Sequence, residues 1–119
     1  MTTQQVAKRL TELCRKGEFE TAQKELFSKD AISIEPQGGN GFEKETKGLN
    51  GILEKGHKFE GMMEKTHGIN VSEPIIANNS IAFKLDMDVT MKGRERENMA
   101  ELCVYEVKDG KIVKEEFFW

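Results

Sequence analysis

Acidic and aromatic side chains alternate with apolar ones in the last third of the chain, from Ser80 to Trp119. Asp86, Glu101 and Glu116 fall in three successive runs, and Tyr105 shares the middle run with Glu101. Carboxyl groups that lie close together in a partly dry pocket cannot all ionise, so one pKa should rise into the range useful for acid–base catalysis. A nearby tyrosine can donate a hydrogen bond to a developing oxyanion. These side chains are the first candidates for catalysis.

The candidates can meet only if the three runs pair as antiparallel strands. Residues 81–91 alternate with a period of two, which is typical of a half-buried strand and fits no helix. Asp109-Gly110 separates the runs 99–107 and 112–119, and Asp-Gly between apolar runs is a strong signal for a two-residue hairpin turn. Gly93-Arg94 is expected to play the same role between the first two runs. The sequence therefore predicts three consecutive antiparallel strands.

Two-residue turns at both places would fix which side chains share a face. Asp86 would oppose Glu101, Val107 would oppose Ile112, and Cys103 would oppose Glu116. An odd-length turn or a bulge would break this grouping, because a slip of one residue inverts a strand. The mixed face is predicted to carry Lys84, Asp86, Asp88, Glu101, Cys103, Tyr105, Glu116 and Phe118. The apolar face is predicted to carry Phe83, Leu85, Met87, Val89, Leu102, Val104 and Phe117.

Two interpretations of these faces are open on the pattern alone. In the first, the apolar face packs on helices and the mixed face meets water, which is what alternation usually means. Each acid would then form a surface ion pair. In the second, the mixed face lines a pocket and the apolar face meets the sheet of a second subunit.

Two histidines are the remaining titratable candidates. His67, beside Gly68, is the better placed for a proton shuttle, and an exposed or capping role is the alternative for both His57 and His67. No His-x-x-x-His spacing occurs, so we expect no metal, and the sequence suggests no cofactor. The residues expected to contact a ligand are His57, Phe59, Met63, Asp88, Cys103 and Phe118.

Length, net charge and cysteine content are those of an ordinary globular protein. A length of 119 residues predicts one domain over residues 1–119, and the formal net charge is −3 with scattered Lys and Arg, so nucleic acid is not an expected partner. No apolar stretch approaches the ~20 residues of a membrane span, so no membrane partner is expected. The start lacks signal-peptide features, and two cysteines without Cys-x-x-Cys spacing predict reduced thiols in a cytoplasmic protein.

The earlier part of the chain supplies the helices. Apolar spacing predicts helices over 3–16, from Glu18 onward and over 48–63, with strands over 31–35 and 66–77. The glycine-rich stretch 37–41 lacks the spacing of a phosphate-binding motif, so we expect a flexible loop there. Helices grouped early and antiparallel strands grouped late predict an α+β fold whose helices cover one face of a curved sheet.

Three segments in this order resemble the SnoaL-like branch of the nuclear transport factor 2-like superfamily. They are the stretch 26–31 that enters the first strand, the stretch 48–52 that opens the third helix, and the final segment 101–119. The resemblance covers nearly the whole chain. It implies a cystatin-like cone with a central pocket, often dimeric through the outer face of the sheet, and it favours the second interpretation of the faces.

The resemblance also implies two classes of function. The first is acid–base isomerase, dehydratase or cyclase chemistry on a small hydrophobic, carbonyl-type ligand, with Asp86, Glu101, Glu116, Tyr105 and His67 as candidate catalytic residues. The second is a non-catalytic dimeric module that binds a ligand or a protein partner. A fold of this kind hosts both classes, so it does not decide between them.

Overall fold

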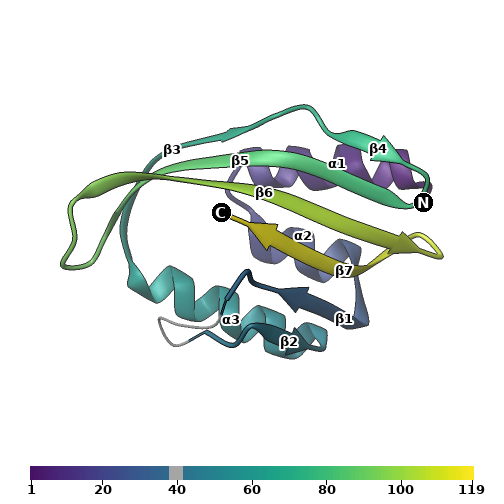
Figure 1. The fold of residues 1–119 in the computed structure, drawn as a ribbon, viewed down its shortest axis with the longest axis horizontal. Coiled ribbons are helices and arrows are strands. Elements are labelled where there is room, and N and C mark those ends of the chain that lie inside the picture. Colours follow the sequence, from purple (N-terminus) through teal and green to yellow (C-terminus); the bar gives the residue numbers. More distant parts are fainter. Residues whose placement is uncertain (38–41) are drawn as a thin grey trace.

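The computed structural model describes residues 1–37 and 42–119, which form an α+β fold with a curved, unclosed sheet (Figure 1). Apart from Gln37, the predicted loop 37–41 lies outside the described residues. In the described part, no helix is long and apolar enough to cross a membrane. The elements are α1 (Thr3–Arg15), α2 (Phe19–Leu26), β1 (Phe27–Ile34), β2 (Glu45–Lys47), α3 (Leu49–Met62), β3 (Met63–Val71), β4 (Ile75–Ala77), β5 (Ser80–Met91), β6 (Arg96–Lys108) and β7 (Lys111–Phe118).

The first helix begins at Thr3, as predicted, and ends at Arg15, one residue before the predicted end. The Thr2 hydroxyl accepts a hydrogen bond from the Gln5 N–H at 3.1 Å, and the Gln5 side chain accepts one from the Thr2 N–H at 2.9 Å. This capping box satisfies two N–H groups that would otherwise lack partners. The chain leaves the helix after Arg15, where Gly17 adopts a φ of +73°. A buried stripe that includes Val6 and Leu10 faces the sheet.

The sheet has the strand order β2-β1-β7-β6-β5-β3, and β4 pairs with the start of β5. β1 and β7 run parallel, and the other neighbours run antiparallel. Figure 1 shows α1 and α2 behind β5, β6 and β7, so helices cover one face of the sheet and leave the other uncovered. We call the covered face the inner face and the other the outer face. The predicted α+β arrangement is confirmed.

The strand boundaries depart from the prediction around the third helix. The predicted strand 66–77 begins three residues earlier, at Met63, and is divided at Pro74 into β3 and β4. Proline lacks the N–H that a ladder needs, which explains the division. The three-residue strand β2 was not predicted, because its sequence, Glu45 to Lys47, has no apolar alternation.

The hairpin between β6 and β7 has the predicted turn followed by an unpredicted bulge. Asp109 and Gly110 adopt φ values of +51° and +76°, and Val107 opposes Ile112 as predicted. Between Glu106 and Val107 the register shifts by one residue. From that point Tyr105 opposes Glu115.

The turn between β5 and β6 has the odd length that inverts a strand. Thr90 opposes Arg96, so an odd number of residues, 91 to 95, separates this pair. The Arg94 N–H donates to the Met91 carbonyl at 3.0 Å, with Gly93 at a φ of +75°. Asp86 consequently opposes Ala100, and the predicted pairing of Asp86 with Glu101 is wrong.

These two shifts of one residue redistribute the side chains between the faces. Leu85 lies opposite Glu101, and Phe83 lies opposite Cys103, so apolar and polar side chains share the inner face. The inner face carries Ile81, Phe83, Leu85, Met87, Glu101, Cys103, Tyr105, Glu115 and Phe117. The outer face carries Lys84, Asp86, Asp88, Leu102, Val104, Glu116 and Phe118. Neither predicted face is therefore correct as a set.

The Asp109-Gly110 turn provides a test of the hairpin geometry. We expect Gly110→Ala to lower the free energy of unfolding by about 1–2 kcal/mol, because a Cβ is strained at positive φ. It would also meet the backbone of Met1 at 2.9 Å. Urea denaturation measures the change. As a control, Gly61→Ala in α3, where a Cβ meets nothing within 4 Å, should stabilise by up to about 1 kcal/mol. Equal stability of the Gly110→Ala variant and the parent would contradict this turn geometry.

Candidate functional site

A group of polar side chains lies on the inner face, surrounded by the apolar core. It is built by β1, β6 and β7 of the sheet and by α3, which packs beside β1. The parallel pairing of β1 and β7 sets Ser33 beside Glu115, and the antiparallel pairing of β7 and β6 sets Glu115 beside Tyr105. We call this group the inner polar cluster. It consists of Ser33, Glu35, Lys55, Glu101, Cys103, Tyr105 and Glu115.

Lys55 joins α3 to the sheet within the cluster. Its ammonium group donates to Glu35 Oε1 at 2.7 Å and to Ser33 Oγ at 2.5 Å. The Lys55 and Glu35 side chains are only 14% and 13% exposed, so this ion pair is largely removed from water. The ammonium group also lies 5.6 Å from the centre of the Phe117 ring, in a cation–π contact. Lys55 is therefore held on three sides.

Glu115 is a buried carboxyl group. The residue is 3% exposed, and burial raises its pKa to about 7. A hydrogen bond from Ser33 and the charge of Lys55 lower the pKa, whereas the charge of Glu35 raises it. Desolvation prevails because a charge in a low-dielectric interior loses its hydration. Glu115 can consequently exchange a proton near neutral pH.

Glu101 is the second inner carboxyl group with a raised pKa. Its pKa is raised to about 7, mainly by burial and in addition by the charges of Glu35 and Glu115. The Cys103 thiol donates to Glu101 Oε1 at 3.6 Å, and this contact lowers the pKa. A thiol is a weak donor, so it compensates little for the lost hydration.

Tyr105 places a hydroxyl group in the same interior. Its ring stacks on Phe83 at 5.4 Å between centroids and meets the Phe27 ring edge-on at 6.4 Å. The residue is 5% exposed, and burial raises its pKa well above the ordinary value. Among residues 1–37 and 42–119, no hydrogen bond involves this hydroxyl group. A neutral phenol without a protein partner is free to donate to a ligand.

The charges within the cluster do not balance. Three carboxyl groups, those of Glu35, Glu101 and Glu115, share the interior with the single ammonium group of Lys55. Ionising all three would leave uncompensated negative charge in a region with little water. At neutral pH the cluster therefore holds at least part of a proton on Glu101 or Glu115.

The structure brings together three of the predicted site residues and separates the rest. Glu101, Cys103 and Tyr105 lie in the inner polar cluster. Phe59 and Met63 are half-buried and pack against the core from α3 and β3. The roles predicted for these residues stay predictions.

Four predicted site residues lie on the outer face, because of the two register shifts. Asp88 forms a bidentate ion pair with Arg96 at 2.7 and 2.9 Å. Asp86 accepts from Asn98 at 3.2 Å, Glu116 lies 3.6 Å from the Lys114 ammonium group, and Phe118 is 46% exposed. The prediction that they share a face with Glu101 is wrong.

Both histidines also lie away from the cluster. The His57 ring contacts the Glu20 carboxylate at 2.5 Å on the surface of α3. The His67 ring contacts the Thr90 hydroxyl at 2.8 Å, and Thr90 alternates with the inward residues of β5. In the described part of the chain, no three His, Cys, Asp or Glu side chains are arranged to hold a metal ion.

Sequence reasoning missed four members of the cluster, Ser33, Glu35, Lys55 and Glu115, and its neighbour Phe117. The alternation of Ala31, Ser33 and Glu35 with two isoleucines does signal a strand with small and polar residues on one side. Glu115 and Phe117 are displaced by the bulge, and the run from Lys114 to Phe118 has no alternation that reveals its phase. Lys55 is a single charge on an amphipathic helix and gives no local signal.

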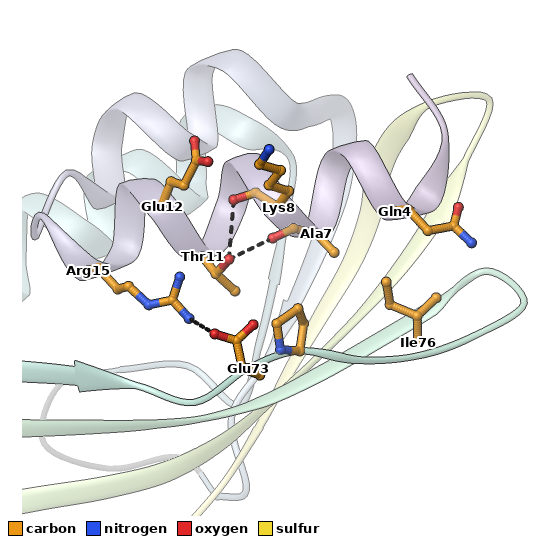
Figure 2. Close-up of a pocket in the computed structure, with 9 residues that line it drawn as sticks. Gln4, Ala7, Lys8, Thr11, Glu12, Arg15, Glu73 and Ile76 are labelled. Atoms are coloured by element: carbon orange, nitrogen blue, oxygen red, sulfur yellow. Dashed lines mark hydrogen bonds and ion pairs between the residues drawn. The ribbon is translucent and has the colours of Figure 1, made fainter.

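A surface groove lies on the other side of α1. It has a volume of about 300 Å³ between α1 and the segment from Glu73 to Ile76 (Figure 2). Two of its polar groups have partners: Arg15 pairs with Glu73 at 3.5 Å, and the Thr11 hydroxyl donates to the Ala7 and Lys8 carbonyls of its own helix. None of the inner polar cluster lines this groove. The carboxyl groups of raised pKa therefore lie away from this groove.

Comparison with known proteins agrees with this architecture. A Mesorhizobium loti protein named as a SnoaL-like polyketide cyclase is 30% identical, with full coverage of both chains and a TM-score of 0.92. An NTF2-like protein of unknown function from Burkholderia pseudomallei is 13% identical over 98% of this chain and 89% of its own, with a TM-score of 0.83. TerC, co-crystallised with polyporic acid, is 15% identical over 98% and 90%, with a TM-score of 0.81. Among curated proteins, none matches.

The chain shares the α+β fold of that NTF2-like protein, with a curved, unclosed sheet, as the resemblance implied. The SnoaL-like domain family matches residues 1–119. The chain belongs to this family.

The raised pKa of Glu115 predicts a pH-dependent stability. In the unfolded chain a glutamate has a pKa near 4.3, so between about pH 4.5 and 7 the folded protein binds more protons than the unfolded one. The contribution of Glu115 to the free energy of unfolding is complete below the pKa that this group has in the unfolded chain. It is lost as the pH rises through about 7. We expect Glu115→Gln to remove up to about 3 kcal/mol of this fall, as measured by urea denaturation from pH 4.5 to 8.

Glu116→Gln provides the matched control for that measurement. Its carboxylate lies one residue away on the outer face, beside Lys114, so its stability curve should follow that of the parent protein. Identical curves for the Glu115→Gln variant and the parent would show that Glu115 is hydrated in the folded protein.

Proposed function

We propose that the inner polar cluster binds a small hydrophobic, carbonyl-type ligand and carries out acid–base chemistry of the isomerase, dehydratase or cyclase type. One observation carries the proposal: Tyr105 is a buried residue whose hydroxyl group has no protein partner, and it lies near two carboxyl groups of raised pKa. A group that donates a hydrogen bond and groups that exchange protons near neutral pH are what enolisation requires.

The glutamates of the cluster can accept and donate every proton that such a step requires. An ionised glutamate takes the proton from a carbon next to the carbonyl group, and the electron pair of that C–H bond forms the enol double bond. A protonated glutamate gives its proton to the carbonyl oxygen, while Tyr105 donates a hydrogen bond to the same oxygen. Return of a proton to another carbon completes an isomerisation, and loss of a leaving group completes an elimination.

The exposure of β6 indicates how a ligand reaches the cluster. On the inner face, Cys103 is fully buried, Glu101 is half-buried and Met99 is 36% exposed. The covering by helices therefore ends toward the β5–β6 hairpin, which extends beyond α1 and α2 in Figure 1. Phe59 and Met63 pack against the core, and methionine adapts to ligands of varied shape. These side chains suit an apolar ligand body.

Two relatives support this class of ligand. The Mesorhizobium loti relative carries the name of a polyketide cyclase, and TerC was crystallised with polyporic acid. The family membership itself supports a ligand-binding or cyclase-like role.

Exchange of a ligand proton for deuterium tests the proposal without knowledge of the physiological substrate. We expect the protein in D₂O to exchange protons next to the carbonyl group in one or more hydrophobic ketones of a panel, as followed by NMR. Glu115→Gln should lower the rate by about 10²–10⁴-fold, and Tyr105→Phe by about 10²–10³-fold.

Asp86→Asn serves as the control, because Asp86 lies on the outer face and should leave the exchange rate unchanged. Exchange that survives in both the Glu115→Gln and Tyr105→Phe variants would contradict the proposal. Binding of panel ketones with no exchange would favour a non-catalytic ligand-binding module.

A dimeric interaction module is the second candidate function, and the outer face favours it. Leu102 and Phe118 lie opposite each other on neighbouring strands, and they are 45% and 46% exposed. Val104 continues the apolar surface along β6. An apolar pair in the centre of an uncovered sheet face suits a contact with the same face of a second copy, which is isologous.

Sedimentation velocity tests whether the protein forms a dimer through its outer face. We expect the parent protein to sediment as a dimer at micromolar concentration and Leu102→Glu to sediment as a monomer, because the variant would place two charges in the contact. Ile75→Glu is the control: Ile75 is 75% exposed on β4, away from the Leu102–Phe118 pair, and should leave the dimer intact. A monomeric parent protein would contradict the dimer.

A further inference from the structure

The two inner carboxyl groups have different hydrogen-bond partners, and this difference divides their roles. We propose that Glu115 is the general base of the site and Glu101 its general acid, and that Ser33 and Lys55 are the positioning residues that fix this division. The inference deepens the acid–base function proposed above and rests on it.

The first step of the argument is the direction of the hydrogen bonds at Ser33. An ammonium group only donates, so Ser33 Oγ is the acceptor in its 2.5 Å contact with Lys55. The single hydroxyl hydrogen of Ser33 is then left for Glu115, its register neighbour on β7, which it reaches as a hydrogen-bond donor. Ser33 is completely buried, so no water competes for that hydrogen.

The second step concerns the charge of Glu115. A carboxyl group that receives a hydrogen bond and lies near an ammonium group is stabilised as the carboxylate, which is the basic form. Lys55 supplies that ammonium group, which contacts Glu35 at 2.7 Å. Ser33 and Lys55 therefore favour ionisation of Glu115, against the opposing charge of Glu35.

The third step is the contrast with Glu101. Its hydrogen-bond donor is the Cys103 thiol at 3.6 Å, which is a weak donor. The charges of Lys55 and Glu35 act on both carboxyl groups in the same directions, so the hydrogen-bond donors distinguish the two. When the pair holds one proton, that proton is consequently favoured on Glu101. Protonated Glu101 can then donate to a ligand oxygen, while ionised Glu115 accepts a proton from carbon.

The other titratable groups around the pair do not disturb this division. Cys14 on α1 and Cys103 on β6 are buried thiols, and burial raises the pKa of Cys14 to about 12. Burial likewise raises the pKa of Cys103 and of Tyr105 well above their ordinary values. All three are neutral when the carboxyl groups titrate, so Lys55 and the three glutamates set the electrostatics.

Carboxyl-carbon NMR measures the division directly and needs no substrate. Glutamate δ carbons are labelled with ¹³C, and the two signals are assigned by their loss in Glu101→Gln and Glu115→Gln. Between pH 4 and 9 we expect Glu115 to lose its proton at lower pH than Glu101. We expect Ser33→Ala to raise the apparent pKa of Glu115 by about one unit, a tenfold smaller ratio of carboxylate to acid at a given pH.

Two further variants keep the test decisive. Ser33→Thr retains the hydroxyl group and should leave the Glu115 titration in place, and Lys55→Met should raise its midpoint even if Ser33→Ala fails to fold. Proton loss from Glu101 first, or a Glu115 midpoint that neither Ser33→Ala nor Lys55→Met moves, would overturn the inference. Absence of ketone exchange with the predicted titration order intact would instead refute the catalytic function alone.

Discussion

Strand register is the constraint on which the interior of this protein depends. Side chains along a strand alternate between faces, so one additional residue decides whether a carboxyl group meets water or the core. The odd-length turn after β5 turns Glu101 inward, and the bulge in β7 turns Glu115 inward. Without these two irregularities, the same strands would present Asp86 and Glu116 beside Tyr105. The backbone register thus determines which carboxyl groups enter the cluster.

Burial then raises the pKa values of the inward carboxyl groups of Glu101 and Glu115. An interior that contains three carboxyl groups and one ammonium group must hold a proton near neutral pH, or it must contain uncompensated charge. The Lys55–Glu35 pair compensates one of the carboxylates and ties α3 to the edge of the sheet. A helix and a sheet that serve as scaffold therefore also set the charges that surround the two glutamates of raised pKa.

The sequence predicted the architecture well and the interior only in part. The alternation in residues 81–91 and the Asp109-Gly110 turn each reflect local physics, and the structure has both. The faces of β6 could not be predicted, because hydrophobicity there does not follow burial: Leu102 is 45% exposed, whereas Glu101 is half-buried. Lys55 joins the site through long-range packing, which no local pattern encodes.

The most direct measurement is a crystal structure of the protein with a hydrophobic ketone or phenol that it binds. The account predicts the ligand oxygen within about 3 Å of the Tyr105 hydroxyl group, with the Glu101 and Glu115 carboxyl groups directed at the ligand. A ligand seated in the groove between α1 and β4, with Tyr105 and both glutamates untouched, would contradict it.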